Sequence, residues 1–146
     1  MQFTQLLGKS MKDDDILEVL EHHDITVTYD FDRTHENIDD LYWAESKEGG
    51  FQFRFNKEKI LDVVFLYMAP REGVEAIDRA LLEVPAFETY DEAQQVCLKK
   101  NIPYKSSPGE PSSPGYKGWI KLDYGVYTVH YQYEVGHLVM ITLEKK

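Results

Sequence analysis

The feature that most constrains the fold of this chain is an internal repeat. Two tryptophans, two alternating patterns and two apolar runs recur at offsets of 76 or 77 residues: Trp43 and Trp119, 51–55 and 127–131, 61–66 and 138–143. Each half also opens with a helical pattern, preceded by Ser10 and Asp13 in the first half and by Thr89 and Glu92 in the second, which favours a capped helix. Self-similarity of this kind indicates a structural unit that is built twice.

The expected unit is one amphipathic helix followed by an antiparallel meander of three or four short strands. In the first half the helical spacing ends near His23, and alternation at period two begins at Ile25. Further alternating segments follow through turn sequences, which is typical of hairpins. We therefore predict an α+β fold with two pseudo-repeated units, residues 1–68 and 89–146, joined by a linking helical segment over residues 69–88 within one compact domain.

The two faces of the expected sheet differ in polarity. Alternation along 51–55 turns three phenylalanines toward the helix and leaves Gln52 and Arg54 facing water. Counting at period two along the last strand of each unit puts apolar residues on the solvent side: Val64, Leu66, Ile141 and Leu143. Such a face is either packed against the other unit or is a concave surface that buries a partner.

The charge of the chain limits its partners. Among 146 residues, 16 Lys and Arg stand against 26 Asp and Glu, so the formal net charge is −10. Residues 13–40 hold eleven acidic residues and one basic residue, Arg33. This field repels phosphate and anionic lipid headgroups, so we expect neither a nucleic-acid partner nor a membrane partner, but a basic one.

The sequence also predicts a cytoplasmic protein. Its first residues lack the basic and apolar pattern of a secretion signal, and no segment approaches the length of a membrane span. Cys97 is the single cysteine, so the chain offers no intramolecular disulfide that would indicate an oxidising compartment.

The acidic run is the candidate binding site. A duplicated unit keeps in both copies what its fold requires, and the acidic run is present only in the first copy. Large aromatic side chains follow it directly, and at interfaces carboxylates steer the encounter while aromatic rings anchor the complex. The expected partner-binding residues are Asp30, Asp32, Glu36, Asp39, Asp40 and Tyr42, with Arg54 and His130 as secondary contacts on the outer face of the sheet.

No motif of the sequence predicts catalysis. Adjacent residues of a helix point about 100° apart, so His22 and His23 do not chelate one metal ion together. The Asp30-Phe31-Asp32 pattern lacks the glycine and glutamate of a calcium loop. Cys97 takes the place of Leu20 on the buried side of a helix, which indicates a core residue. We therefore expect no catalytic residue, no metal and no cofactor.

The pattern resembles two groups of known proteins. Tandem units of a capped helix and a meander resemble the architecture of the β-lactamase inhibitor protein and of small outer-membrane assembly lipoproteins. The opening Leu6-Leu7-Gly8-Lys9-Ser10, with Tyr42, Phe51–Phe55 and Ile60–Leu66, is similar to bacterial immunity proteins that neutralise pyocin-like or contact-dependent toxins. The lipoproteins carry a lipidated cysteine after a signal peptide, which is absent here.

The resemblance to immunity proteins implies a function. These proteins are commonly small, acidic, cytosolic and non-catalytic, because many of their toxins are basic nucleases that act inside the cell. By that resemblance the chain is an inhibitor that occludes a cationic protein toxin, with nuclease as the expected activity of the toxin; its own oligomeric state stays open. Two alternatives remain: a phage-encoded inhibitor that mimics nucleic acid, and a small enzyme that uses a divalent metal in the acidic loop.

Overall fold

The computed structural model of the chain describes residues 2–23, 25–30 and 40–146. The helical elements are α1 (Phe3–Leu6), α2 (Asp14–His22), α3 (Tyr90–Lys100) and the 3₁₀ turn η1 (Arg79–Leu81). The strands are β1 (Val27–Asp30), β2 (Leu41–Ser46), β3 (Phe51–Phe55), β4 (Leu61–Tyr67), β5 (Tyr104–Ser107), β6 (Lys117–Asp123), β7 (Tyr127–Glu134) and β8 (His137–Lys145).

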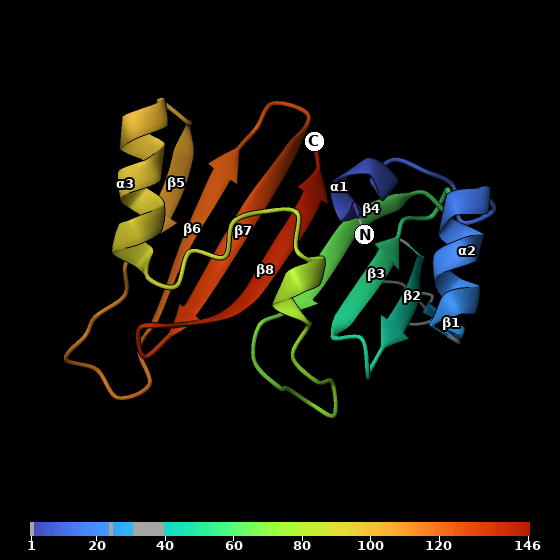
Figure 1. Cartoon of the computed structure of the whole chain (residues 1–146), viewed down its shortest axis with the longest axis horizontal. Coiled ribbons are helices and arrows are strands. Elements are labelled where there is room, and N and C mark those ends of the chain that lie inside the picture. Colours follow the sequence, from blue (N-terminus) through green and yellow to red (C-terminus); the bar gives the residue numbers. More distant parts are fainter. Residues whose placement is uncertain (1, 24, 31–39) are drawn as a thin grey trace.

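These strands form one antiparallel sheet in the order β1-β2-β3-β4-β8-β7-β6-β5. The strands β4 and β8 pair at its centre, so the two halves of the chain share one continuous sheet. The helices α1 and α2 lie beside the first four strands and α3 beside the last four (Figure 1). The fold is therefore α+β, as the sequence predicts.

The two longer helices begin at side-chain caps. Asp13 caps α2, because its carboxylate accepts a hydrogen bond from the N–H of Asp15; the expected cap, Ser10, lies a turn earlier and bridges to Ile60 instead. Thr89 caps α3 as predicted, with its hydroxyl accepting from the N–H of Glu92 at 3.2 Å. Both helices thus start where a short polar side chain satisfies a free backbone N–H group.

One face of the sheet is covered by the helices and carries the core. Phe51, Phe53 and Phe55 are fully buried, as predicted, and Phe3 of α1 packs on the first two with ring centroids 5.4 and 6.3 Å away. In the second half the same face presents Tyr131 and other buried residues of β7 to the core. Burial on alternate residues explains the period-two pattern of the sequence.

The strand β4 carries an irregularity that reverses its expected facing. A β-bulge at Arg54 shifts the register between β3 and β4, and a bulge adds a residue that flips the alternation beyond it. Val64 and Leu66 consequently lie on the covered face, so the expectation that they face outward is wrong. Val63 and Phe65 point to the opposite face instead.

The strand β8 carries a bulge at the corresponding place. The register between β7 and β8 shifts at Gln132, so Ile141 and Leu143 pair with core residues of β7 and lie on the covered face. Met140, which pairs with Gln132, faces outward. The expected facing of this strand is therefore wrong for the same reason, because period-two counting does not anticipate a bulge.

The segment between the halves is mostly extended rather than helical. The predicted helical segment over 69–88 reduces to η1, a single turn, and the chain then crosses the covered face in front of β7 and β8 (Figure 1). Two buried tyrosines hold it there: the hydroxyl of Tyr131 donates to the carbonyl of Pro85, and that of Tyr133 to the carbonyl of Phe87, each at 2.8 Å. The linking segment thus completes the cover of this face.

Candidate protein-binding face

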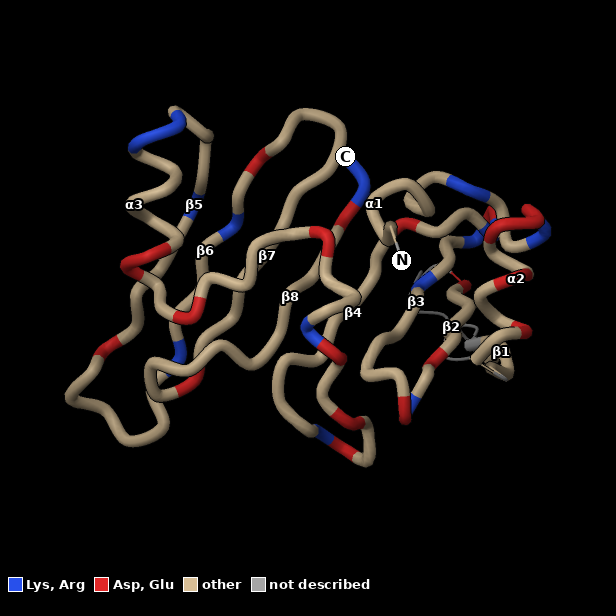
Figure 2. The backbone as a smooth tube through the Cα atoms, in the orientation of Figure 1, with Lys and Arg blue, Asp and Glu red and all other residues tan. Residues whose placement is uncertain are grey.

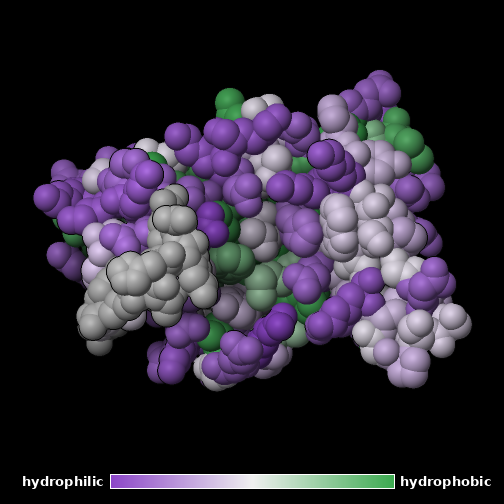
Figure 3. Space-filling view, turned by 180° about the vertical axis from the view of Figure 1, so that it is seen from behind, coloured by the Kyte–Doolittle hydropathy of each residue, from purple (hydrophilic) through white to green (hydrophobic). Residues whose placement is uncertain are grey.

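The opposite face of the sheet is left uncovered by the described helices, and Val74 of the linking segment packs against its apolar residues. Figure 3 views this face and shows hydrophobic side chains gathered in a recessed area near its middle, with hydrophilic side chains around them. We call it the open face. Because directly paired residues share a face, the strand registers give its rows: Thr28, Trp43, Arg54, Val63, Glu144, Thr128 and Asp123; then Glu45, Gln52, Phe65, Thr142, His130, Lys121 and Lys105; then Tyr67, Met140, Gln132, Trp119 and Ser107.

Both tryptophans of the chain lie on the open face, each on the second strand of its half. Trp43 on β2 stacks against Phe65, with ring centroids 6.1 Å apart and planes inclined by 26°. Trp119 on β6 lies against His130, with centroids 5.4 Å apart. Both indoles are only partly buried. Five strand steps of about 4.8 Å each separate the two strands across the sheet, so the tryptophans mark two regions of one surface.

The centre of the open face is apolar. Val63, Met140 and Tyr67 are 2%, 8% and 9% exposed, although none of the described helices covers them. Met140 and Tyr67 form a small apolar cluster with Val74 of the linking segment, and Phe65 packs against it. The middle of this face is thus a packed apolar floor rather than a wet sheet surface.

Charged residues of both signs surround that centre. Arg54 and Asp62 form a two-pronged ion pair with N–O distances of 3.2 and 3.0 Å. Across the second half, Lys121 lies 3.9 Å from Glu144. Burial lowers the pKa of His130, the nearby Lys121 lowers it further, and Glu144 raises it. The surroundings of His130, next to Trp119, therefore favour its neutral form.

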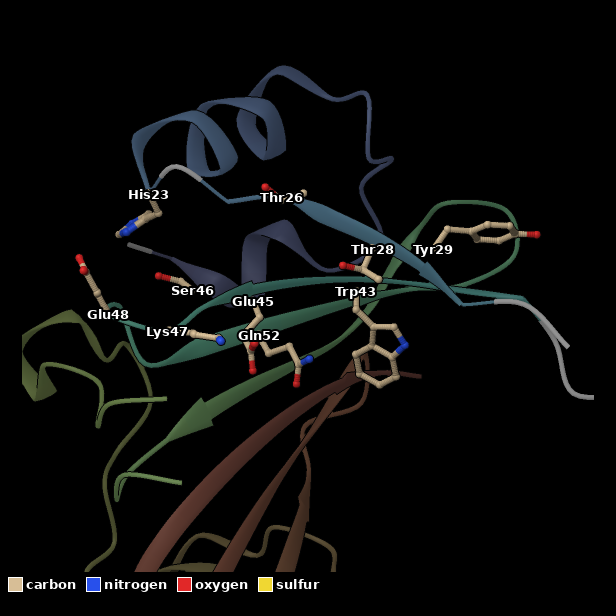
Figure 4. Close-up of a pocket in the computed structure, with 10 residues that line it drawn as sticks. All are labelled: His23, Thr26, Thr28, Tyr29, Trp43, Glu45, Ser46, Lys47, Glu48 and Gln52. Atoms are coloured by element: carbon tan, nitrogen blue, oxygen red, sulfur yellow. The ribbon is translucent and has the colours of Figure 1, made fainter. Parts of the chain in front are cut away.

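A groove of about 890 Å³ opens at the β1 edge of the sheet (Figure 4). Its lining residues come from the segment between α2 and β1, from β1, β2 and β3, and from the β2–β3 turn: His23, Thr26, Thr28, Tyr29, Trp43, Glu45, Ser46, Lys47, Glu48 and Gln52. Figure 4 shows Trp43, Glu45 and Gln52 on the side of the sheet away from the helices. The groove exists here because Ala44 is the last residue of β2 that pairs with β1, so Glu45 and Ser46 extend beyond it.

The expected binding residues lie in different parts of the structure, and some lie outside the described residues. Asp32, Glu36 and Asp39 lie outside the described residues, and Asp30 is the last residue of β1. Arg54 and His130 both lie on the open face, as predicted, but on β3 and β7, with β4 and β8 between them. Tyr42 alternates with Ala44 and packs against the core cluster on the covered side. Among the described members of this set, Tyr42 thus lies on the other side of the sheet from Arg54 and His130.

Tyr42 and Asp40 belong to a small aromatic group at the end of β1. The ring of Tyr42 stacks on Tyr29 with centroids 4.7 Å apart, and the Lys59 ammonium lies 5.7 Å from its centre. The hydroxyl of Tyr29 donates to the carboxylate of Asp40 at 2.7 Å. This hydrogen bond, with burial second, raises the pKa of Tyr29 to about 12. Asp40 therefore helps to order the end of β1.

Sequence reasoning missed several residues of the open face, namely Glu45, Val63, Phe65 and Met140. Glu45 could have been found from the sequence, because it follows Trp43 by two residues and alternation places the two side chains on one side of the strand. Val63, Phe65 and Met140 are missed because counting at period two does not anticipate the bulges and places their neighbours Val64, Leu66 and Ile141 on this face instead.

The described residues offer little for catalysis. No group of three or more His, Cys, Asp and Glu side chains among them is arranged to hold a metal ion. Cys97 is buried, and burial raises the pKa of its thiol. His22 and His23 contact each other edge to face, and the ring of His23 also packs on Phe51. Burial lowers the pKa of His23, with His22 as a lesser cause.

Comparison with known proteins gives no relative: no protein-family model matches the chain, and neither a curated protein nor a solved structure is significantly similar to it. Among the described helices, none is long and apolar enough to cross a membrane.

Proposed function

We propose that this protein is an immunity or inhibitor protein that binds a basic protein toxin and neutralises it by steric and electrostatic occlusion. The observation that carries the proposal is the open face, where two partly exposed tryptophans flank an apolar floor. Aromatic side chains set in packed, water-poor surroundings are the commonest anchors of protein interfaces. A face of this kind, which none of the described helices covers, fits a second macromolecule better than a small substrate.

The charge of the chain supports a cationic partner of the nuclease class. A nuclease must attract the phosphates of its substrate, so its active surface is basic, and a chain of net charge −10 is drawn to such a surface. Four carboxylates lie along α2, at the same end of the molecule as the groove (Figure 2): Asp14, Asp15, Glu18 and Glu21. The sequence carries further acidic residues over 30–40.

The open face favours this function over a nucleic-acid mimic. A mimic needs carboxylates in place of phosphates along its contact surface, whereas the open face mixes signs and pairs them, as in Arg54 with Asp62 and Lys121 with Glu144. On the present proposal the chain performs no chemistry, uses no cofactor and acts in the bacterial cytoplasm.

We also propose that the two halves arose by duplication, which the strand pairing supports. Phe53 lies between Ala44 and Val64 in the ladder, and Tyr131 lies between Ile120 and Ile141. On this proposal Phe53 corresponds to Tyr131, at an offset of 78 rather than the 76 expected for these strands.

The central ladder supports the duplication as well. Val64 pairs with Leu143, and Leu66 pairs with Ile141. Exchanging each of these residues for its counterpart at an offset of 77 turns one pair into the other, as a two-fold relation requires. The proposal would be contradicted by a superposition of the two halves in which Trp43 and Trp119 fall at different ladder positions.

The function is tested by capture followed by an activity assay. The tagged chain is expressed in its source cell, the protein that co-purifies is identified by mass spectrometry, and its activity is measured with increasing amounts of the chain. We expect a basic partner whose nuclease activity is abolished at a one-to-one ratio. An acidic partner, or a partner whose activity is unchanged by a saturating amount of the chain, would overturn the proposal.

A further inference from the structure

The groove at the β1 edge combines an aromatic ring with carboxylates that form no ion pair with any described residue. Among the described residues, neither Glu45 nor Glu48 forms an ion pair, although both line the groove with Trp43. Glu45 stands two residues from Trp43 on the same face of β2, about 7 Å further along the strand. Gln52 pairs directly with Glu45 and adds an amide beside it. The groove thus offers a π surface and negative charge within reach of one cationic group.

The corresponding position in the second half carries the opposite charge. Trp43 pairs with Arg54 next to the first bulge, and Trp119 pairs with Gln132 next to the second, so the two indoles hold matching places. Two residues after each indole the chain has Glu45 in the first half and Lys121 in the second.

The residues that pair with Glu45 and Lys121 on the neighbouring strands also differ between the two halves. Gln52 pairs with Glu45, whereas His130 pairs with Lys121. Lys121 also lies 3.9 Å from Glu144, while Glu45 has no such partner among the described residues. The tryptophan is therefore common to both halves, and an unpaired carboxylate beside it is specific to the first.

We propose that the groove beside Trp43 binds an arginine side chain of the partner, with the guanidinium stacked on the indole and hydrogen-bonded to Glu45. Arginine fits better than lysine because its planar group stacks on aromatic rings and meets a carboxylate with two parallel N–H groups. In naming a protein partner the inference rests on the proposed function, and it identifies the group by which a basic partner is held at this end of the open face.

Lys47 provides a second test of the proposal, with an expected effect of opposite sign. It lies in the β2–β3 turn and lines the same groove, where Figure 4 shows its side chain on the side of Glu45 and Gln52. Because its ammonium repels an incoming guanidinium, removing that charge should strengthen arginine binding, whereas removing the charge of Glu45 should weaken it. A purely structural disturbance would not produce effects of opposite sign.

The experiment uses N-acetyl-arginine amide as the probe and the ¹⁵N-labelled full chain. The two indole N–H signals are assigned with Trp43→Phe and Trp119→Phe, and the probe is titrated while both are recorded. We expect saturable binding in the millimolar range, appropriate to a ligand of this size, with the Trp43 signal shifting and the Trp119 signal unmoved. N-acetyl-citrulline amide, which has the same shape without the charge, should leave both signals in place.

Matched variants complete the test. Glu45→Gln should weaken binding of the arginine probe by about two- to fivefold, the range of an exposed ion pair, and Lys47→Gln should strengthen it. Glu134→Gln, which removes a carboxylate of β7 far from the groove, should bind as the parent chain does. The backbone amide spectrum of each variant verifies that it is folded.

Equal shifts with arginine and citrulline, equal shifts of both indoles, or unchanged affinity in Glu45→Gln would overturn the inference. Any of these results would leave the proposed function intact if the captured partner is still inhibited. Conversely, if arginine binds at Trp43 but the chain does not inhibit its captured partner, the proposed function would be refuted while the arginine-binding groove would stand.

Discussion

The hydroxyl of Tyr133 should matter more to folding than that of Tyr131. Both donate to carbonyls of the linking segment at 2.8 Å, but the bond from Tyr133 to Phe87 is buried, whereas Pro85, the acceptor for Tyr131, is an exposed residue. Phe87 is 6% exposed, and its own ring packs on Tyr131 with centroids 5.1 Å apart. The perturbation is therefore Tyr133→Phe compared with Tyr131→Phe, each of which removes a single oxygen.

The magnitudes follow from what happens to each carbonyl. In Tyr133→Phe the acceptor stays buried without a donor, which costs about 1–3 kcal/mol of unfolding free energy. In Tyr131→Phe the acceptor belongs to an exposed residue and its bond is only part-buried, so we expect water to replace the hydroxyl and the loss to be the net value of one hydrogen bond, about 0.5–1.5 kcal/mol. For a chain of this size each kcal/mol corresponds to about 2–4 °C in Tm.

Urea unfolding followed by far-ultraviolet circular dichroism measures both variants against the parent chain. We expect a lower midpoint with an unchanged denaturant slope, and a larger loss for Tyr133→Phe. The reasoning would be refuted if Tyr131→Phe were the more destabilised, or if neither variant differed from the parent.

Four further outcomes are expected. Burial raises the pKa of Tyr131 and Tyr133, so above about pH 10 the unfolded chain releases protons that the folded state keeps. The free energy of unfolding should therefore fall as the pH rises above about 10. In the variant with both tyrosines replaced by Phe, the urea midpoint should fall less steeply over the same pH range. The pKa of His130, measured by NMR, should lie below its usual value and fall further in Glu144→Gln, which removes the group that raises it. Thr89→Ala removes the cap of α3 and should cost about 1 kcal/mol in urea unfolding. Asp39→Ala with Asp40→Ala should slow association with the captured partner and flatten its salt dependence in stopped-flow measurements, with little loss of folding stability; an unchanged rate at low salt would remove the acidic run from the site.

The sequence was informative where local chemistry decides the structure. Phe51–Phe55 forms a strand with the predicted bounds because alternation of apolar and polar residues matches the strand period. Thr89 and Glu92 predicted the start of α3 for an equally local reason, since the threonine hydroxyl meets an N–H group three residues away.

The open face could not be predicted, because its composition depends on pairing between distant strands. The bulges at Arg54 and Gln132 are properties of two strands together, and each reverses the side on which later residues lie. The apolar outer residues are consequently Val63 and Met140 rather than their predicted neighbours Val64 and Ile141. Similarly, the apolar spacing of 74–82 suggests a helix, whereas tyrosines more than 40 residues away hold the following segment extended.

The central claim is that the open face binds the partner, and the affinity of the captured complex tests it most directly. Trp43→Ala and Trp119→Ala each remove an anchor, so each should raise Kd by about 30-fold or more, which corresponds to a loss of about 2 kcal/mol of binding free energy. Leu98→Ala is the control, because Leu98 is a large apolar residue, 57% exposed, that lies on α3 away from the open face. The account predicts loss of affinity in both tryptophan variants and parental affinity in Leu98→Ala. Parental affinity in both tryptophan variants, with loss in Leu98→Ala, would contradict it and move the binding surface to the helices.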